Sequence, residues 1–155
     1  MKLESHKLAV IPLLELETFL PYRLSVLSNR VSSRIARSYE KRFGLTIPEW
    51  RVMAVLGRFP GLTAAEVAER TAMDKVQVSR AVARLQRAGR IEQRTVDGDR
   101  RAKHLSLSAS GRIVHGEIVP LAREMEMRLV VALSAAERAQ LDQILDKLLA
   151  ASASL

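Results

Sequence analysis

The 155-residue chain contains no cysteine, only three histidines and few aromatic residues, which make up 4% of it. Without thiols it has no disulfide, no thiolate metal site and no cysteine-based redox switch. The histidines, at positions 6, 104 and 115, are not spaced as a helical pair, so we expect ordinary surface or core histidines and no metal. Glycine-rich phosphate loops and nucleophile motifs are also missing. The sequence therefore predicts no catalytic residue, no cofactor and no enzymatic activity.

The chain also lacks an apolar run of membrane-spanning length and an N-terminal secretion signal. We therefore expect a cytoplasmic protein. It has no internal repeat or low-complexity segment, and its length suits a single domain.

Basic side chains outnumber acidic ones by 25 to 17, which gives a net charge of +8 and an isoelectric point of about 10.6. Such a balance favours a polyanionic partner, most simply nucleic acid. Residues 49–107 hold twelve basic and seven acidic groups, whereas residues 108–155 hold five and six. The C-terminal third is therefore not expected to face the polyanion.

Residues 63–89 have the pattern of two short helices joined by a turn. Thr63 and Glu66 have the spacing of a capping box, which begins a helix. Asp74 suits the N-cap of the second helix, which continues without glycine or proline to Gly89, where a left-handed cap is expected. The pattern predicts a helix-turn-helix.

The second of these helices has one apolar face and one basic face. The apolar face, which we expect to be buried, holds Val78, Ala81, Val82 and Leu85. The opposite face offers guanidinium groups for phosphates, an amide for a base edge and small apolar groups for a thymine methyl. It consists of Val76, Arg80, Ala83 and Arg87, flanked by Gln77, Ser79 and Arg84. This composition is typical of a recognition helix, and a solvated surface helix is the alternative.

A β-hairpin is predicted directly after these helices. Residues 91–96 form a strand-like run, Asp97 and Gly98 are typical of a two-residue turn, and residues 103–107 alternate as a return strand. A basic tip, residues 99–101, lies beside the turn. Helix, turn, helix and basic hairpin in this order predict a winged helix.

Further helices flank the winged helix. Residues 21–43 and 108–130 carry apolar residues at three- and four-residue steps, and capping boxes at Thr46 and Ser134 begin two more helices. Residues 8–16 are also apolar. Because a small winged helix cannot bury all of these faces, we expect a two-fold dimer built by both ends of the chain.

Five short motifs follow one another along these segments: Met73-Asp74-Lys75, Val78-Ser79-Arg80, Leu85 before Ala88-Gly89, Asp97-Gly98-Asp99-Arg100-Arg101 and Leu107-Ser108-Ala109-Ser110-Gly111. In this order they resemble the MarR family of bacterial transcription regulators. The resemblance covers nearly the whole chain. One departure is Arg90, where an apolar residue is usual and where packing at the start of the wing is expected to be weaker.

The residues and the resemblance together predict a mainly α fold with a small β-hairpin wing, in a single domain of residues 1–155. About 46–107 is the expected DNA-binding lobe, and about 8–43 and 108–150 are the expected dimerisation helices. We interpret the chain as a homodimeric transcriptional regulator, a repressor, that binds a pseudo-palindromic double-stranded DNA operator. The alternative is a winged-helix dimer that binds DNA non-specifically or binds proteins.

The predicted DNA contacts are Thr63, Lys75, Val76, Gln77, Ser79, Arg80, Arg84, Arg87, Asp99, Arg100, Arg101 and Lys103. The resemblance implies that Arg101 enters the minor groove and that Asp99 orients it. It also implies control by a ligand where the dimerisation helices meet the lobe. There we expect a small aromatic or otherwise hydrophobic carboxylate whose charge is met by an arginine. The candidate ligand-binding residues are Arg30, Arg34, Trp50 and His115.

Overall fold

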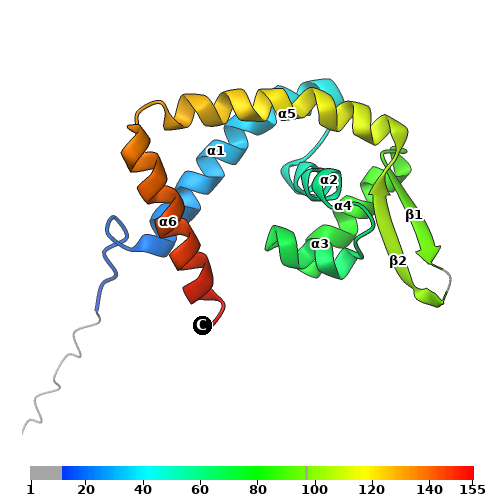
Figure 1. The fold of residues 1–155 in the computed structure, drawn as a ribbon, viewed down its shortest axis with the longest axis horizontal. Helices are drawn as coiled ribbons and strands as arrows, with labels where there is room; N and C mark the ends of the chain where they lie inside the picture. Colours follow the sequence, from blue (N-terminus) through cyan, green and yellow to red (C-terminus); the bar gives the residue numbers. More distant parts are fainter. Residues whose placement is uncertain (1–11, 97) are drawn as a thin grey trace, which may run out of the picture.

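The computed structural model describes residues 12–96 and 98–155 (Figure 1). In chain order its elements are α1 (Leu20–Phe43), α2 (Ile47–Arg58), α3 (Ala64–Thr71), α4 (Lys75–Arg87), β1 (Ile91–Val96), β2 (Asp99–Leu107), α5 (Ala109–Val130) and α6 (Ala135–Ser152). The predicted fold class is confirmed. Figure 1 shows α2, α3, α4 and the hairpin gathered at one end of α5, with α6 and the first turns of α1 at the other.

Short polar motifs begin five of the helices, as the sequence predicts. α2, α3 and α6 start with capping boxes at Thr46, Thr63 and Ser134, in which a glutamate carboxylate accepts the N–H of the cap residue. Asp74 and Ser108 cap α4 and α5 by accepting an N–H three residues on. Each helix start is thus set by a local interaction.

The start of α1 follows from a proline. Pro21 lies in the first turn, where a missing N–H loses no helical hydrogen bond. A helix beginning earlier would place Pro21 in its interior, so residues 12–19 are not helical and α1 begins at Leu20. Residues 8–11 of the expected dimerisation segment, like His6 and Asp97, lie outside the described residues.

The helices of the lobe pack around one core. α2 lies against α3 and α4, and it also contacts β2 and α5. The largest fully buried side chains are Tyr39, Met53, Leu56, Leu85, Leu105 and Ile118. They come from α1, α2, α4, β2 and α5, so this core joins the lobe to both long helices.

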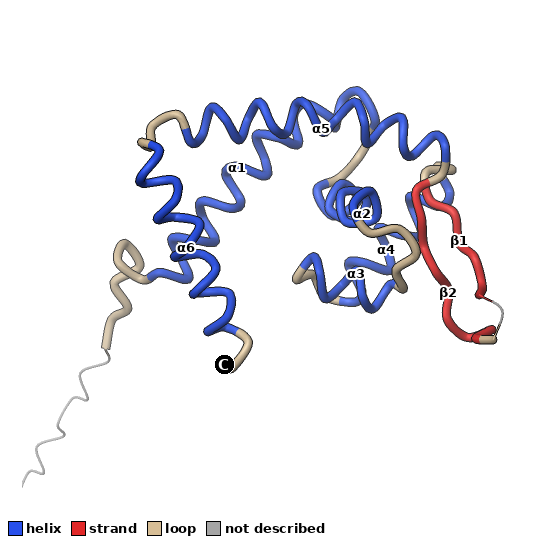
Figure 2. Tube along the Cα trace, viewed as in Figure 1, coloured by secondary structure: helices blue, strands red, loops and turns tan. Residues whose placement is uncertain are grey.

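The hairpin is longer than the sequence predicts (Figure 2). β1 pairs antiparallel with β2, which begins at Asp99 and not at Lys103. Val96 pairs with Asp99, after a register irregularity between Thr95 and Val96. The sequence does not predict that β2 begins at Asp99, because residues 99–101 lack alternating apolar side chains.

Apolar side chains at the end of the molecule away from the lobe remain uncovered. α6 has no buried residue, and Ile144 and Leu149 on it are 53% and 68% exposed. Leu24 and Leu27 on α1 are exposed as well. Within the described ranges, no helix has both the length and the apolar character needed to cross a membrane.

Candidate nucleic-acid interface

α4 is anchored by its apolar face and presents its basic face to solvent. Val78, Ala81, Val82 and Leu85 are buried, as predicted. After the helix, Gly89 adopts a left-handed conformation with a φ of 69°, which turns the chain toward β1. The exposed residues of α4 include Lys75, Val76, Gln77, Ser79, Arg80, Arg84 and Arg87. The structure therefore brings all of the predicted contacts of this helix onto its accessible side.

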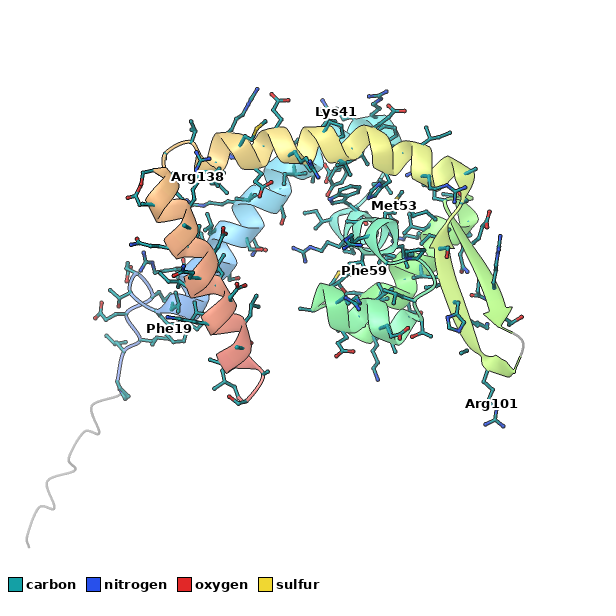
Figure 3. The ribbon with its side chains drawn as sticks, viewed as in Figure 1. Phe19, Lys41, Met53, Phe59, Arg101 and Arg138 are labelled. Atoms are coloured by element: carbon teal, nitrogen blue, oxygen red, sulfur yellow. The ribbon has the colours of Figure 1, made fainter. Side chains whose placement is uncertain are left out.

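The other predicted contacts lie at the start of α3 and on the wing. Thr63 is half-buried, and its hydroxyl is engaged in the capping box of α3. Lys103 is exposed on β2, and Arg101 points away from the lobe at the far end of the hairpin (Figure 3). Asp99 and Arg100 occupy the first two positions of β2.

His104 ties the wing to the loop before α3, a contact that sequence reasoning missed. Its Nδ1 lies 2.7 Å from the carbonyl oxygen of Gly61, so Nδ1 carries the proton and donates it. The Gly61 N–H donates to the Leu105 carbonyl at 2.8 Å and lies 3.1 Å from the Ser106 hydroxyl. The wing is thus held by groups more than forty residues away, which no local pattern signals.

Arg90 ties the wing to α1. Its guanidinium donates a hydrogen bond of 2.6 Å to the carbonyl of Phe43, the last residue of α1. A cation suits the partial negative charge at the C-terminus of a helix. The residue that departs from the family pattern therefore joins the end of α1 to the start of the wing.

Glu49 is another residue that sequence reasoning placed only as a cap. Its Oε2 accepts the Thr46 N–H at 2.8 Å, as the capping box predicts. The residue is 5% exposed, and its Oε1 lies 3.9 Å from Nη1 of Arg84 on α4. Beside it, a pocket of about 200 Å³ separates the start of α2 from α4. Its lining residues are Thr46, Pro48, Glu49, Gln77, Arg80, Ala81 and Arg84.

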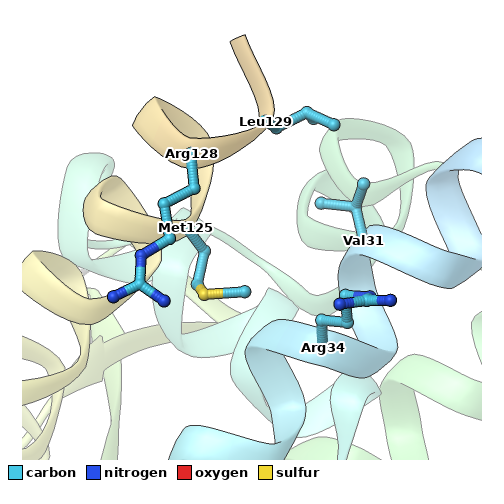
Figure 4. Close-up of a pocket in the computed structure, with 5 residues that line it drawn as sticks. All are labelled: Val31, Arg34, Met125, Arg128 and Leu129. Carbon is cyan, nitrogen blue, oxygen red and sulfur yellow. The ribbon is translucent and has the colours of Figure 1, made fainter. Parts of the chain in front are cut away.

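Several of the residues predicted for a ligand site line pockets, and Trp50 lines one between α1 and α2. Arg34 lines a pocket of about 290 Å³ between α1 and α5 (Figure 4). The other lining residues are Val31, Met125, Arg128 and Leu129. Arg34 also lines a second pocket, on an exposed part of α1, together with Arg30 and Arg37. Arg34 alone of the predicted set faces the pocket between α1 and α5, which has apolar and basic side chains.

Trp50 packs between the rings of Tyr39 and His115, which are tilted relative to it and have centroids 5.8 and 5.7 Å away. Burial raises the pKa of Tyr39 to about 12, and it lowers the pKa of His115. A side chain at Gly57 would overlap the His115 ring, so the helices approach closely here. Trp50 and His115 therefore pack α2 against α5.

A helix-turn-helix with an exposed basic face, followed by a hairpin wing, defines a winged-helix DNA-binding protein. Residues 43–102 match the sequence profile of the MarR family. The HTH-type transcriptional repressor Rv2887 of Mycobacterium tuberculosis is 26% identical over 131 residues, which cover 84% of this chain and 91% of the relative. The chain is similar to MarR-family regulators and is a DNA-binding transcription regulator.

Solved structures show the same fold. The S. aureus MepR–DNA complex matches with a TM-score of 0.77 and 24% identity, over 86% of this chain and 98% of that one. The PcaV regulator of Streptomyces coelicolor, in complex with its natural ligand, matches with a TM-score of 0.76 and 22% identity, over 92% and 99%.

Proposed function

We propose that the protein is a transcriptional repressor that binds a pseudo-palindromic operator as a homodimer. The observation that carries this proposal is the exposed basic face of α4. The opposite face of this helix is buried in the core, and a basic hairpin follows it in the chain. A dimer places two such helices in successive major grooves, roughly 34–36 Å apart. The name of the M. tuberculosis relative supports repression, and the DNA complex of MepR supports the binding mode.

Within the lobe, about residues 46–107, we assign the contacts by their chemistry. Gln77 and Arg80 suit base edges in the major groove, and Lys75, Arg87 and Lys103 suit phosphates. Ser79, Val76 and Thr63 complete the surface facing DNA. Arg101 is assigned to the minor groove, with Asp99 and Arg100 beside it.

Footprinting of the purified protein on DNA around its own gene tests the proposal. Protection of a short, two-fold symmetric sequence at nanomolar protein is the expected result, with at least about a thousandfold weaker binding to unrelated DNA of equal length. Equal affinity for all sequences would favour the alternative of non-specific DNA packaging. The relatives are regulators, which supports a protein without catalytic activity that acts in the cytoplasm beside the chromosome.

We also propose an effector site in the α1/α5 pocket. Val31, Met125 and Leu129 offer an apolar surface, and Arg34 offers a guanidinium that has no ion pair within the described residues. This combination suits a hydrophobic carboxylate, and the ligand complex of PcaV supports control by a small molecule.

A panel of aromatic carboxylates tests the effector site, with the matching neutral amides as controls. The acids are expected to raise the melting temperature and release operator DNA, and the amides are not. The Arg34→Ala variant should lose the response to the acids. An unchanged response in that variant would remove Arg34 from the site.

A further inference from the structure

The glutamates of the three capping boxes have different surroundings. Glu66 and Glu137 are exposed, whereas Glu49 is 5% exposed. A capping box uses one carboxylate oxygen at the surface of a helix end and requires no burial. The cap of α2 therefore accounts for Oε2 of Glu49, but it does not account for the burial of the residue or for Oε1.

The second oxygen of Glu49 faces the recognition helix. Oε1 lies 3.9 Å from Nη1 of Arg84, and within the described ranges this is the one ion pair of Glu49. A buried carboxylate without a cation is strongly unfavourable, so pairing with Glu49 stabilises the Arg84 guanidinium in this position. The ion pair joins α2, which lies outside the helix-turn-helix, to α4.

Arg84 lies at the border between α2 and the DNA-facing side of α4. Gln77, Arg80 and Arg84 follow one another at helical spacing and line the pocket beside Glu49. The Arg84 side chain is 58% exposed, so its guanidinium is accessible to phosphates as well as to Glu49. Glu49 and the DNA backbone are thus competitors for the same cation.

We propose that Glu49 is a positioning residue that holds Arg84 on the α2 side of the recognition helix and withholds it from DNA phosphates. This inference rests on the proposed DNA-binding role of α4. Each phosphate neutralised by a cation steepens the salt dependence of binding, so an arginine held by Glu49 contributes little to that slope. Glu49 thereby limits the number of phosphates that each recognition helix neutralises.

The Glu49→Gln variant tests the proposal because its amide oxygen still accepts the Thr46 N–H. Affinity is measured over a range of salt concentrations, on operator and on unrelated DNA. We expect tighter binding to both and a slope of log affinity against log salt that is steeper by about one per recognition helix. A disturbed fold cannot produce this gain. In the double variant with Arg84→Gln, the slope should return to the wild-type value.

Glu66→Gln is the matched control, since it removes the same charge from the capping box of the neighbouring helix. Its effect should be smaller, and it should be the same with or without Arg84. If Glu49→Gln and Glu66→Gln act alike, or if the gain of Glu49→Gln persists without Arg84, the proposal is wrong. Weaker binding by a folded Glu49→Gln protein also overturns it, because the carboxylate would then direct Arg84 toward DNA.

Two exposed arginines give a test that does not depend on the fold of the Glu49 variant. Arg84→Gln should leave the salt slope nearly unchanged, whereas Arg87→Gln should reduce it by about one per helix. Equal reductions would overturn the role of Glu49 while leaving the DNA-binding function intact. A wild-type protein without salt-dependent DNA binding would overturn the function itself.

Discussion

Gln77, Arg80 and Arg87 share the exposed side of α4 but lie at different points along it. Gln77 and Arg80 are in its first half, the part of a recognition helix that reaches base edges, and Arg87 is its last residue. Changing Gln77 or Arg80 to Ala should lower the discrimination between operator and mutated operator by about 1–3 kcal/mol per lost base contact. Arg87→Ala should weaken binding to both DNAs alike. Quantitative gel shifts with both DNAs measure the difference, and equal losses for all three variants would show that this helix does not read sequence.

Arg101 and Asp99 allow a test of the wing. For Asp99, simple charge repulsion and the proposed orienting role predict opposite changes in DNA affinity. Arg101→Ala should lower operator affinity by roughly 1–3 kcal/mol and reduce the salt slope by about one per wing. Asp99→Ala should also lower affinity, although it removes a negative charge that repels DNA. Fluorescence anisotropy measures both. Tighter binding by Asp99→Ala would mean that this carboxylate does not orient Arg101.

His115 should make stability depend on pH in a defined window. Burial lowers the pKa of His115, so its imidazole takes up a proton at a higher pH in the unfolded chain than in the folded chain. The free energy of unfolding should therefore fall as the pH drops below about 6.5, the pKa of an unperturbed histidine. Chemical denaturation between pH 5 and pH 8 measures this, and His115→Gln should flatten the profile. The capping hydrogen bonds of Glu66 and Glu137 lower the pKa values of these carboxyl groups, so their effect on stability falls at more acidic pH.

At the scale of elements, two glycines of α5 provide a matched pair. A Cβ at Gly111 would overlap the carbonyl of Arg90, where the first turn of α5 packs against the start of the wing. A Cβ at Gly116 would meet nothing within 4 Å. Gly111→Ala should destabilise the fold by about 1–3 kcal/mol or more, whereas Gly116→Ala should stabilise it by about 0.5–1 kcal/mol. Thermal unfolding compares them, and a neutral Gly111→Ala would mean that the two backbones separate easily.

Helix starts and the buried face of α4 were predictable because both depend on residues close in sequence. The capping boxes at Thr46 and Thr63 need only a glutamate three residues on, and helical spacing alone places Val78 in the core. The burial of Glu49 and the bond between His104 and Gly61 were not predictable, because distant segments create them. The sequence thus predicts which helix presents the candidate site, but not which groups outside that helix adjust it.

The whole molecule combines a well-packed lobe with uncovered apolar faces at its other end. The core fixes the recognition helix within the lobe, whereas α6 buries none of its residues. Regulators of this family act as dimers on DNA. A second copy that covered α6 and the start of α1 would bury the exposed leucines and set the separation of the two recognition helices. Contacts far from DNA would then determine which half-site spacing the protein binds.

Removing α6 should therefore abolish dimerisation. A chain ending at residue 133 loses the exposed apolar face of α6 while keeping the core of the lobe. In sedimentation velocity it should run as a monomer or aggregate, and its operator affinity should fall because one half-site alone is bound. Within the full chain, Ile144→Glu should weaken the dimer, since it places a charge where the second copy is expected to cover α6. Gln143→Glu adds the same charge at the neighbouring polar position of α6 and should weaken it much less. A soluble dimer of residues 1–133 with full operator affinity would show that the two copies associate elsewhere.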